Sequence, residues 1–209
     1  MGKGQVHDDP KFRYVDNHSD REILRLTDYL GHSNHLYFTD PCWFNDNRSF
    51  VFTSQRENQG NLYRYDLDDG KITQMTDFGD RYRPGGIVSA VNNAVYLFHE
   101  RRLLEIDLES LEERVICEIE GEMAPGGRAN PTADGKYLCT MLRERKPPAD
   151  DTPRISYSYS SLVETFEAKP FTQIVRIDCE TGDMEVIHED RRSMGHVNTS
   201  PVLPDILTF

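Results

Sequence analysis

The sequence predicts an all-β fold, a β-propeller built from four-stranded antiparallel blades. One pattern, a strand, a polar turn and a second strand, recurs at 61–77, 102–118 and 173–189. Two further strand-like stretches precede each copy, at 42–54, 87–99 and 130–142. Four strands in a unit of about 40 to 45 residues are typical of a propeller blade. No segment has a convincing helical period, and the best helical candidate, 103–113, is better explained by the repeat.

Turn-forming residues separate the strands of each repeat. Asp66, Asp107 and Asp178 occupy equivalent positions after the first strand of the repeated pair. Asp side chains bond to nearby backbone N–H groups and therefore favour tight turns. The three aspartates are 41 and then 71 residues apart, so the second interval is 30 residues longer than the first. This difference indicates one repeat plus an insertion.

We therefore expect one incomplete propeller domain over 1–209. In chain order its parts are the outer strands of a closing blade at 14–30, a blade at 31–78, a blade at 81–119, a blade at 124–190 with an insertion at 143–171, and the start of the next blade at 194–209. Half a blade at each end predicts the first three to four blades of a larger propeller, because closed propellers leave no sheet edge open. A compact four-bladed ring closed by the two halves is the alternative.

Composition excludes several classes of protein. The chain has 36 acidic and 24 basic residues, a net charge of −12, which disfavours non-specific binding to nucleic acid or to an anionic membrane. Ten Phe and ten Tyr are too many for a disordered chain. No run approaches the roughly 18 apolar residues of a membrane span, and the first residues have no apolar signal region. Four widely spaced cysteines without a CxxC pattern favour buried thiols in a reducing cytoplasm.

One face of the propeller is expected to collect basic side chains. Links between blades, and links between the second and third strands of a blade, open on the same face around the central channel. This rule places at the channel mouth the candidate ligand-binding residues His35, Arg56, Arg83 and Arg128, together with His196. Any one of them could be an ordinary solvated residue. As a group in an acidic protein, they indicate a receptor for a small anionic ligand.

The insertion at 143–171 is rich in Pro and then in Tyr and Ser. Loops of this length are usually functional or disordered. Two interpretations stay open: a lid or subsite wall in which Tyr157 and Tyr159 stack on a sugar, and a mobile tether. GxSxG, HExxH and phosphate-binding glycine motifs are absent from the sequence.

Two blocks of sequence resemble one known family. Residues 32–77, HSNHLYFTDPCWFNDNRSFVFTSQRENQGNLYRYDLDDGKITQMTD, resemble the opening blade of the oligogalacturonate lyases. Residues 194–209, MGHVNTSPVLPDILTF, are similar to that family's Gly-His stretch. The resemblance implies a seven-bladed propeller and a cytoplasmic, pectin-degrading lyase that acts on oligogalacturonides with a divalent metal, usually manganese. It also implies that His196 is the catalytic base and that the metal ligands, several His and a Gln, lie beyond Phe209. We therefore expect no metal site within 1–209 and no activity from this segment alone.

The residue types suit this chemistry. Elimination removes a proton α to a carboxylate, which a neutral imidazole can accept near pH 7 while cations neutralise the developing charge. The alternatives are a non-catalytic propeller, similar to TolB-like or WD-type scaffolds, that binds a protein or carbohydrate partner, and the propeller of a prolyl-oligopeptidase-like enzyme. We expect no nucleic-acid or membrane partner, and self-association of the segment through its open sheet edges.

Overall fold

The computed structural model describes residues 2–79, 84–145, 163 and 165–209. The chain divides into two compact units, residues 1–95 with 106–113 (unit 1) and residues 96–105 with 114–209 (unit 2). The described residues are mainly short antiparallel strands. Helical structure among them is limited to the 3₁₀ turn η1 (Arg56–Asn58) and to residues 163 and 165–167. The predicted all-β class is confirmed.

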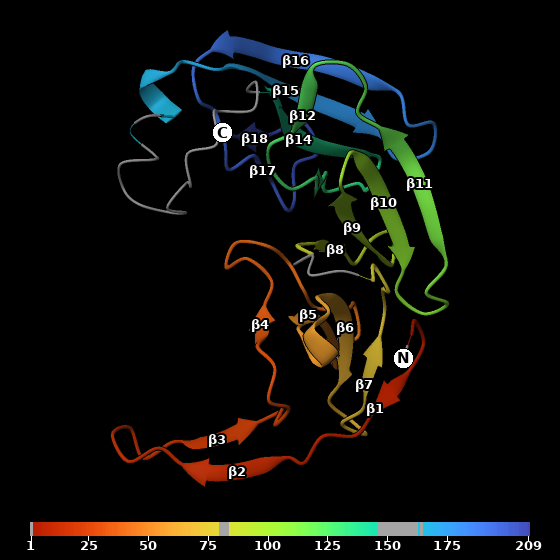
Figure 1. The fold of residues 1–209 in the computed structure, drawn as a ribbon, viewed down its shortest axis with the longest axis vertical. Helices are drawn as coiled ribbons and strands as arrows, with labels where there is room; N and C mark the ends of the chain where they lie inside the picture. The colour runs from red at the N-terminus through yellow and green to blue at the C-terminus, as the bar shows by residue number, and fades with distance from the viewer. Residues whose placement is uncertain (1, 80–83, 146–162, 164) are drawn as a thin grey trace. The chain divides into compact units, whose positions relative to one another are not determined.

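Unit 1 contains a five-stranded antiparallel sheet with the order β1-β7-β6-β5-β4 (Figure 1). Its strands are β1 (Val6–His7), β4 (Ser33–His35), β5 (Ser49–Ser54), β6 (Asn61–Asp66) and β7 (Ile72–Gln74). The last four lie within residues 31–78. Strand β1 was not predicted; it covers the outer edge of β7 by pairing Val6 with Thr73 and His7 with Ile72.

Alternation along β5 and β6 places a row of aromatic rings on one face of this sheet. Phe52, Tyr63, Tyr65 and Ile72 form a buried cluster. Phe50 stacks on Tyr65 with the ring centres 5.5 Å apart. Burying each such side chain contributes about 1.5–3 kcal/mol, so this aromatic face stabilises the sheet.

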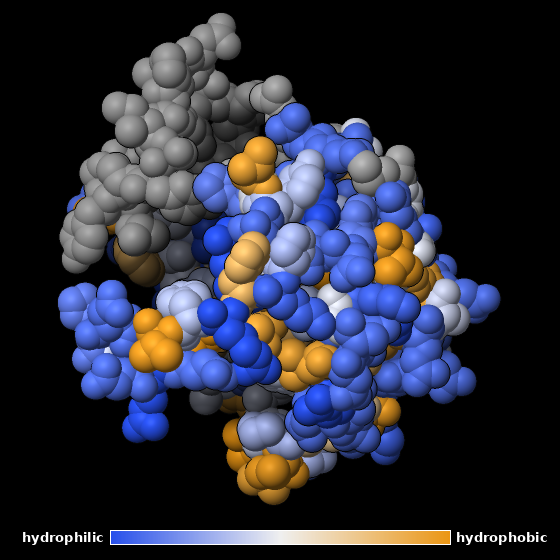
Figure 2. All heavy atoms as spheres, turned by 90° about the horizontal axis from the view of Figure 1, so that it is seen from below, coloured by the Kyte–Doolittle hydropathy of each residue, from blue (hydrophilic) through white to orange (hydrophobic). Residues whose placement is uncertain are grey.

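A separate hairpin precedes the sheet in the chain. Strands β2 (Phe12–Val15) and β3 (Glu22–Arg25) pair only with each other among the described strands. Leu26, just after β3, packs against the aromatic cluster of the unit 1 sheet. Most of the hairpin is exposed, including Phe12 and Val15. Figure 2 shows hydrophobic residues exposed in separate groups among hydrophilic ones on one face of the molecule.

The next sheet has four strands in the order β11-β10-β9-β8, and its residues are shared between the two units. The strands are β8 (Ile87–Ser89), β9 (Ala94–His99), β10 (Arg102–Asp107) and β11 (Glu113–Glu118). They lie within residues 81–119.

Unit 2 contains a sheet in the order β12-β14-β15-β16, with β13 also paired to β14. The strands are β12 (Met123–Pro125), β13 (Asn130–Pro131), β14 (Tyr137–Glu144), β15 (Phe171–Asp178) and β16 (Met184–Arg191). A final hairpin, β17 (Asn198–Thr199) with β18 (Leu207–Thr208), follows it. Its Leu207 packs on a core cluster made of Cys139, Met141, Ile174, Met194 and Val197.

The first strand of two blades differs from the expectation. His35 and Arg128 were expected in links between blades, but His35 lies in a strand, since Ser33–His35 forms β4, and Met123–Pro125 forms β12 just before Arg128. Strand β4 pairs with the C-terminal end of β5, and the Trp43–Phe50 bridge pairs with the other end of β5. In the same way β12 pairs with the C-terminal end of β14, and β13 pairs nearer its beginning. Segments of three residues are too short to show a period of two, which is why the sequence did not reveal them.

The strands also extend into the predicted insertion. Arg143 and Glu144 belong to β14, and Phe171 is the first residue of β15. The connection between these strands is therefore 145–170. Most of it, with Tyr157 and Tyr159, lies outside the described residues.

One type of turn, built on an aspartate, closes a hairpin four times. In each copy the aspartate N–H donates to the carbonyl five residues later, and the N–H four residues later donates back to the aspartate carbonyl. The aspartate carboxylate also accepts backbone N–H groups of the turn. The aspartates are Asp16, Asp66, Asp107 and Asp178. Hydrogen bonds from Ser19, Ser110 and Thr181 lower the pKa of Asp16, Asp107 and Asp178, respectively.

The fifth residue of this turn has a positive φ in every copy. It is Asp20, Gly70, Leu111 or Gly182, with φ between 54° and 77°. A Cβ atom on Gly182 would lie 2.2 Å from the carbonyl oxygen of Ile116, so this copy requires glycine. Leu111 holds the same conformation with a side chain that disfavours it.

We expect opposite results from exchanging residue types at this position. Gly182→Ala should lower the free energy of unfolding by about 2 kcal/mol or more, because it combines an unfavourable φ with a backbone clash. Leu111→Gly should leave it unchanged or raise it by up to about 1 kcal/mol. Urea denaturation of the two variants measures both values. Equal losses in the two variants would show that the turn conformation does not control stability.

Candidate functional site

The predicted site residues are divided between the two units. His35 and Arg56 lie in unit 1, Arg128 and His196 lie in unit 2, and Arg83 lies outside the described residues. The surroundings of four residues can therefore be described. The meeting of all five at one channel mouth stays a prediction.

His196 lies between β16 and β17, in a short segment whose backbone is fixed on both sides. Met194 and Val197 are buried in the core cluster of unit 2. The carbonyl of His196 accepts a hydrogen bond of 2.7 Å from the side-chain amide of Asn198. His196 itself is exposed and has a φ of 51°. A strained residue between buried anchors is a feature that clusters at functional sites, because the anchors fix where its side chain points.

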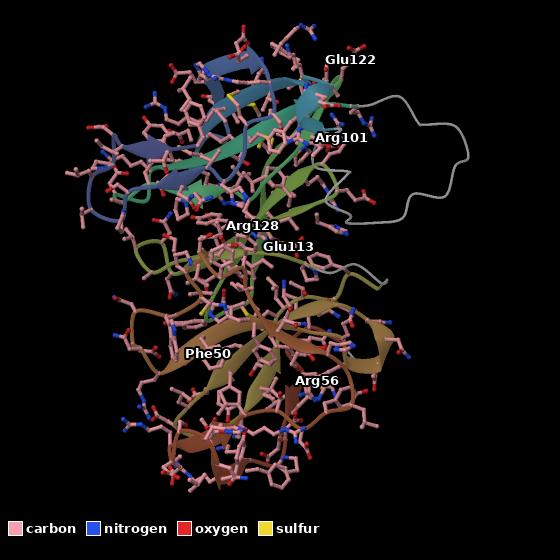
Figure 3. All side chains as sticks on the ribbon, turned by 90° about the vertical axis from the view of Figure 1, so that its left-hand side faces the viewer. Phe50, Arg56, Arg101, Glu113, Glu122 and Arg128 are labelled. Atoms are coloured by element: carbon pink, nitrogen blue, oxygen red, sulfur yellow. The ribbon has the colours of Figure 1, made fainter. Side chains whose placement is uncertain are left out.

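Arg128 lies on a segment adjacent to that of His196. It is exposed in the break between β12 and β13 (Figure 3). The Asn130 side-chain amide donates a 2.6 Å hydrogen bond to the carbonyl of Val197, one residue after His196. The structure therefore brings together two segments that are 67 residues apart in sequence.

Arg143 is a further basic residue in this region, which the sequence analysis placed only at the start of the insertion. Its Nη2 donates to the hydroxyl of Ser193 at 3.2 Å, three residues before His196. Its Nε is buried and has no acceptor among the residues that the structure describes. The alternation of β14 could have indicated Arg143 if the strand had been extended past Leu142.

In unit 1, Arg56 is buried, with an exposed fraction of 4% (Figure 3). It belongs to η1, in the connection between β5 and β6. Its Nη1 and Nη2 donate to Oδ1 and Oδ2 of Asp9 at 3.0 and 2.5 Å. Its guanidinium carbon lies 4.8 Å from the ring centre of Tyr29 and 5.7 Å from that of Tyr63. The contacts that Arg56 makes in this structure are therefore internal.

Charge and burial shift the pKa values of the groups around Arg56. Burial alone would raise the pKa of Asp9, but the hydrogen bonds and charge of Arg56 outweigh it, and the pKa of Asp9 is lowered. Burial and the Arg56 charge lower the pKa of His7. Burial raises the pKa of Tyr63 to about 12. Near neutral pH, Asp9 is ionised and His7 and Tyr63 are uncharged.

Both ring nitrogens of His35 have partners inside unit 1. Nδ1 lies 2.8 Å from the carbonyl oxygen of Leu36, and Nε2 lies 2.9 Å from the sulfur of Cys42. Burial raises the pKa of the Cys42 thiol, so the thiol donates to Nε2 and Nδ1–H donates to the carbonyl. His35 is exposed, but both of its nitrogens are engaged. It could hydrogen-bond a ligand only by giving up one of these partners.

The four cysteines are free thiols, as the sequence predicted. Burial raises the pKa of each, to about 11 for Cys139 and about 12 for Cys179. Within the described ranges there is no group of three or more His, Cys, Asp or Glu that could hold a metal ion. No helix in the described part of the chain is long and apolar enough to cross a membrane.

Comparison with known proteins gives a consistent result. The family model for oligogalacturonate lyase matches residues 1–209. An oligogalacturonide lyase of Pectobacterium atrosepticum is 27% identical over 186 residues, which cover 88% of this chain and 46% of the relative. An oligogalacturonate lyase of Dickeya dadantii is 27% identical over 199 residues, covering 94% and 50%. The chain spans about half the length of these relatives.

Solved structures show the same likeness. An oligogalacturonate lyase from Vibrio parahaemolyticus superimposes with a TM-score of 0.83 at 27% identity, over 96% of this chain and 52% of that one. An oligogalacturonate lyase in complex with manganese superimposes with a TM-score of 0.83 at 25% identity, over 95% of this chain and 52% of that one. A TolB-like protein from Agrobacterium tumefaciens superimposes with a TM-score of 0.50 at 14% identity, over 86% of this chain and 60% of that one. This likeness shows the fold alone. These likenesses and the order of the strands confirm the predicted propeller.

The Asp9–Arg56 pair should make the stability of the protein depend on pH in the acid range. Because the folded pKa of Asp9 lies below its unfolded value of about 3.9, the pair stabilises fully above that value and the stabilisation is lost as the pH falls through the folded pKa. Asp9→Asn should therefore cost about 3 kcal/mol at pH 7 and flatten the acid limb of the stability curve.

The exposed pair of Arg48 and Asp68 provides a matched control. Asp68→Asn should leave the curve close to that of the wild type, because exposed ion pairs contribute little. Denaturation between pH 2 and pH 7 gives the three curves. An unchanged acid limb in Asp9→Asn would show that the buried pair is not the source of the pH dependence.

Proposed function

The chain belongs to the oligogalacturonate lyase family, and we propose that in the complete enzyme it contributes to β-elimination of short oligogalacturonides. The match of the family model to all 209 residues carries this proposal. The same match favours a lyase over the alternative of a non-catalytic TolB-like propeller, since the TolB likeness extends to the fold alone.

We propose that His196 is the general base. Its exposed ring stands on a backbone held by Met194, Val197 and Asn198, so its nitrogen can be presented to a ligand in a fixed direction. In the elimination, the C–H bond α to the carboxylate breaks and its proton moves to the imidazole. The electron pair forms a double bond to the β carbon, the glycosidic C–O bond at that carbon breaks, and the departing oxygen takes up a proton from water to become a hydroxyl. A positioned base of this kind contributes roughly 10² to 10⁴-fold to the rate.

Cations near the base would neutralise the carboxylate as it gains charge. Arg128 is proposed for this role because its segment is bonded to that of His196. His35, Arg56 and Arg83 are proposed as further substrate-binding residues. The polar atoms of His35 are engaged by Cys42 and Leu36, and those of Arg56 by Asp9, so either residue would have to exchange a partner to bind substrate.

A relative has been solved with manganese, and we propose a divalent metal, manganese by analogy, for the complete enzyme. The described residues of this chain do not form a ligand group for it. The ligands are therefore proposed to lie outside these residues, where the metal would stabilise negative charge. We further propose that the enzyme degrades pectin fragments in the cytoplasm and that the open sheet edges of this segment allow self-association.

Replacing the proposed base tests the mechanism. In the complete enzyme, His196→Ala should lower kcat by roughly 10² to 10⁴ with a smaller change in substrate affinity, because only the base is lost. The unsaturated product from digalacturonate or trigalacturonate can be followed by ultraviolet absorbance. His18, an exposed histidine in the Asp16 turn, gives a matched control, and His18→Ala should keep the wild-type rate. Turnover at the wild-type rate in His196→Ala would remove this residue from the mechanism.

Substrate charge gives a second test. Galacturonate oligomers should bind the complete enzyme more tightly than neutral galactose oligomers of the same length, and their affinity should fall as salt rises, because Arg side chains recognise the carboxylates. Isothermal titration calorimetry at several salt concentrations measures both effects. Equal affinity for the two sugars would contradict the proposed cationic site.

A further inference from the structure

Arg56 is a buried cation whose hydrogen-bonding capacity Asp9 fills only in part. A guanidinium has five N–H donors. Asp9 accepts from Nη1 and Nη2, whereas Nε is buried and has no acceptor among the described residues. A buried donor without a partner is unfavourable, because it has given up its hydrogen bonds to water. The described residues therefore leave one donor of Arg56 without an acceptor.

The surroundings of this guanidinium are those of a carboxylate site. Two parallel N–H···O bonds to one carboxylate are the geometry that arginine offers to carboxylates in general. The rings of Tyr29 and Tyr63 lie against the guanidinium, and Tyr29 is itself 40% exposed. His7 adds a ring nitrogen, Nε2, that is buried and has no partner in the described part of the chain.

Asp9 lies on a segment at the edge of the unit 1 sheet. Residues 2–11, which we name the strap, attach to this edge through the two-residue strand β1 and through backbone hydrogen bonds of Gly4 and Gln5 with Gln74. Val6 in β1 is exposed. Asp28 N–H adds a 3.3 Å hydrogen bond to the Asp9 carboxylate. Segments with few buried apolar contacts open at lower free energy than core strands.

We propose that Arg56 is a binding site for the carboxylate of a uronate ligand, and that Asp9 is an internal ligand that occupies it until the two exchange. A uronate supplies a carboxylate for Nη1 and Nη2, and its ring and hydroxyl oxygens are acceptors for Nε. The choice of a uronate rests on the proposed function, whereas the carboxylate site rests on the geometry of unit 1 alone. Because a tethered group competes at an effective concentration in the millimolar range, Asp9 keeps the site closed to weak ligands.

Removal of the internal carboxylate tests this proposal. Asp9→Ala should destabilise the protein, and sodium formate should restore stability along a saturable curve that sodium chloride at equal ionic strength does not reproduce. The formate concentration that gives half of the stabilisation should be at least tenfold lower in Asp9→Ala than in the wild type, because in the wild type Asp9 occupies Arg56. The double variant Asp9→Ala/Arg56→Met should not respond. Equal responses to formate and chloride, or an equal response in the double variant, would overturn the carboxylate site.

The same variant identifies the ligand class. Galacturonate should stabilise Asp9→Ala as formate does, and galactose should not. A response to formate without one to galacturonate would overturn the assignment to a uronate. If Asp9→Ala does not fold in chloride, the measurement becomes the yield of folded protein after refolding in formate and in chloride. Equal yields in the two salts would overturn the proposal. None of these measurements uses lyase activity, so absence of turnover in the complete enzyme would refute the proposed function and leave the site intact.

Discussion

The buried ion pair between Asp9 and Arg56 is the interaction on which the arrangement of unit 1 depends. It joins the strap at the beginning of the chain to the connection between β5 and β6, and the ring of Tyr29 adds the segment that leads into β4. Transfer of two charges out of water costs several kcal/mol for each ion, and attraction offsets this only when both partners are present in good geometry. Loss of either partner leaves an uncompensated buried charge and removes the contact that joins these segments at Arg56.

Local turns and contacts between distant segments contribute differently to the fold. The aspartate turns at Asp16, Asp66, Asp107 and Asp178 fix the register of successive hairpins through bonds between near neighbours. Contacts between distant segments then place the candidate site residues. In unit 2 the bond from Asn130 to the carbonyl of Val197 brings the segment of Arg128 to that of His196. The cation and the proposed base are thus set on loops that a rigid core positions.

Features with a local pattern could be predicted from the sequence, and features that depend on distant pairing could not. The repeats and their aspartates were enough to predict the blades. The strands β1, β4 and β12 were missed because two or three residues carry no alternation. Arg56 was recognised as a candidate, but its partner, 47 residues away, was not, since 36 acidic residues offer too many choices. The pairing of His35 with Cys42 likewise required coordinates.

A double-mutant cycle on Asp9 and Arg56 tests most directly whether this pair holds unit 1 together. The free energies of unfolding of the wild type, Asp9→Ala, Arg56→Ala and the double variant give the coupling energy between the two side chains. We expect a coupling energy of about 2 kcal/mol or more, because each single substitution leaves one buried charge without its partner. The double variant should therefore be far more stable than the sum of the two single losses implies. Additive losses, with a coupling below about 0.5 kcal/mol, would contradict the account.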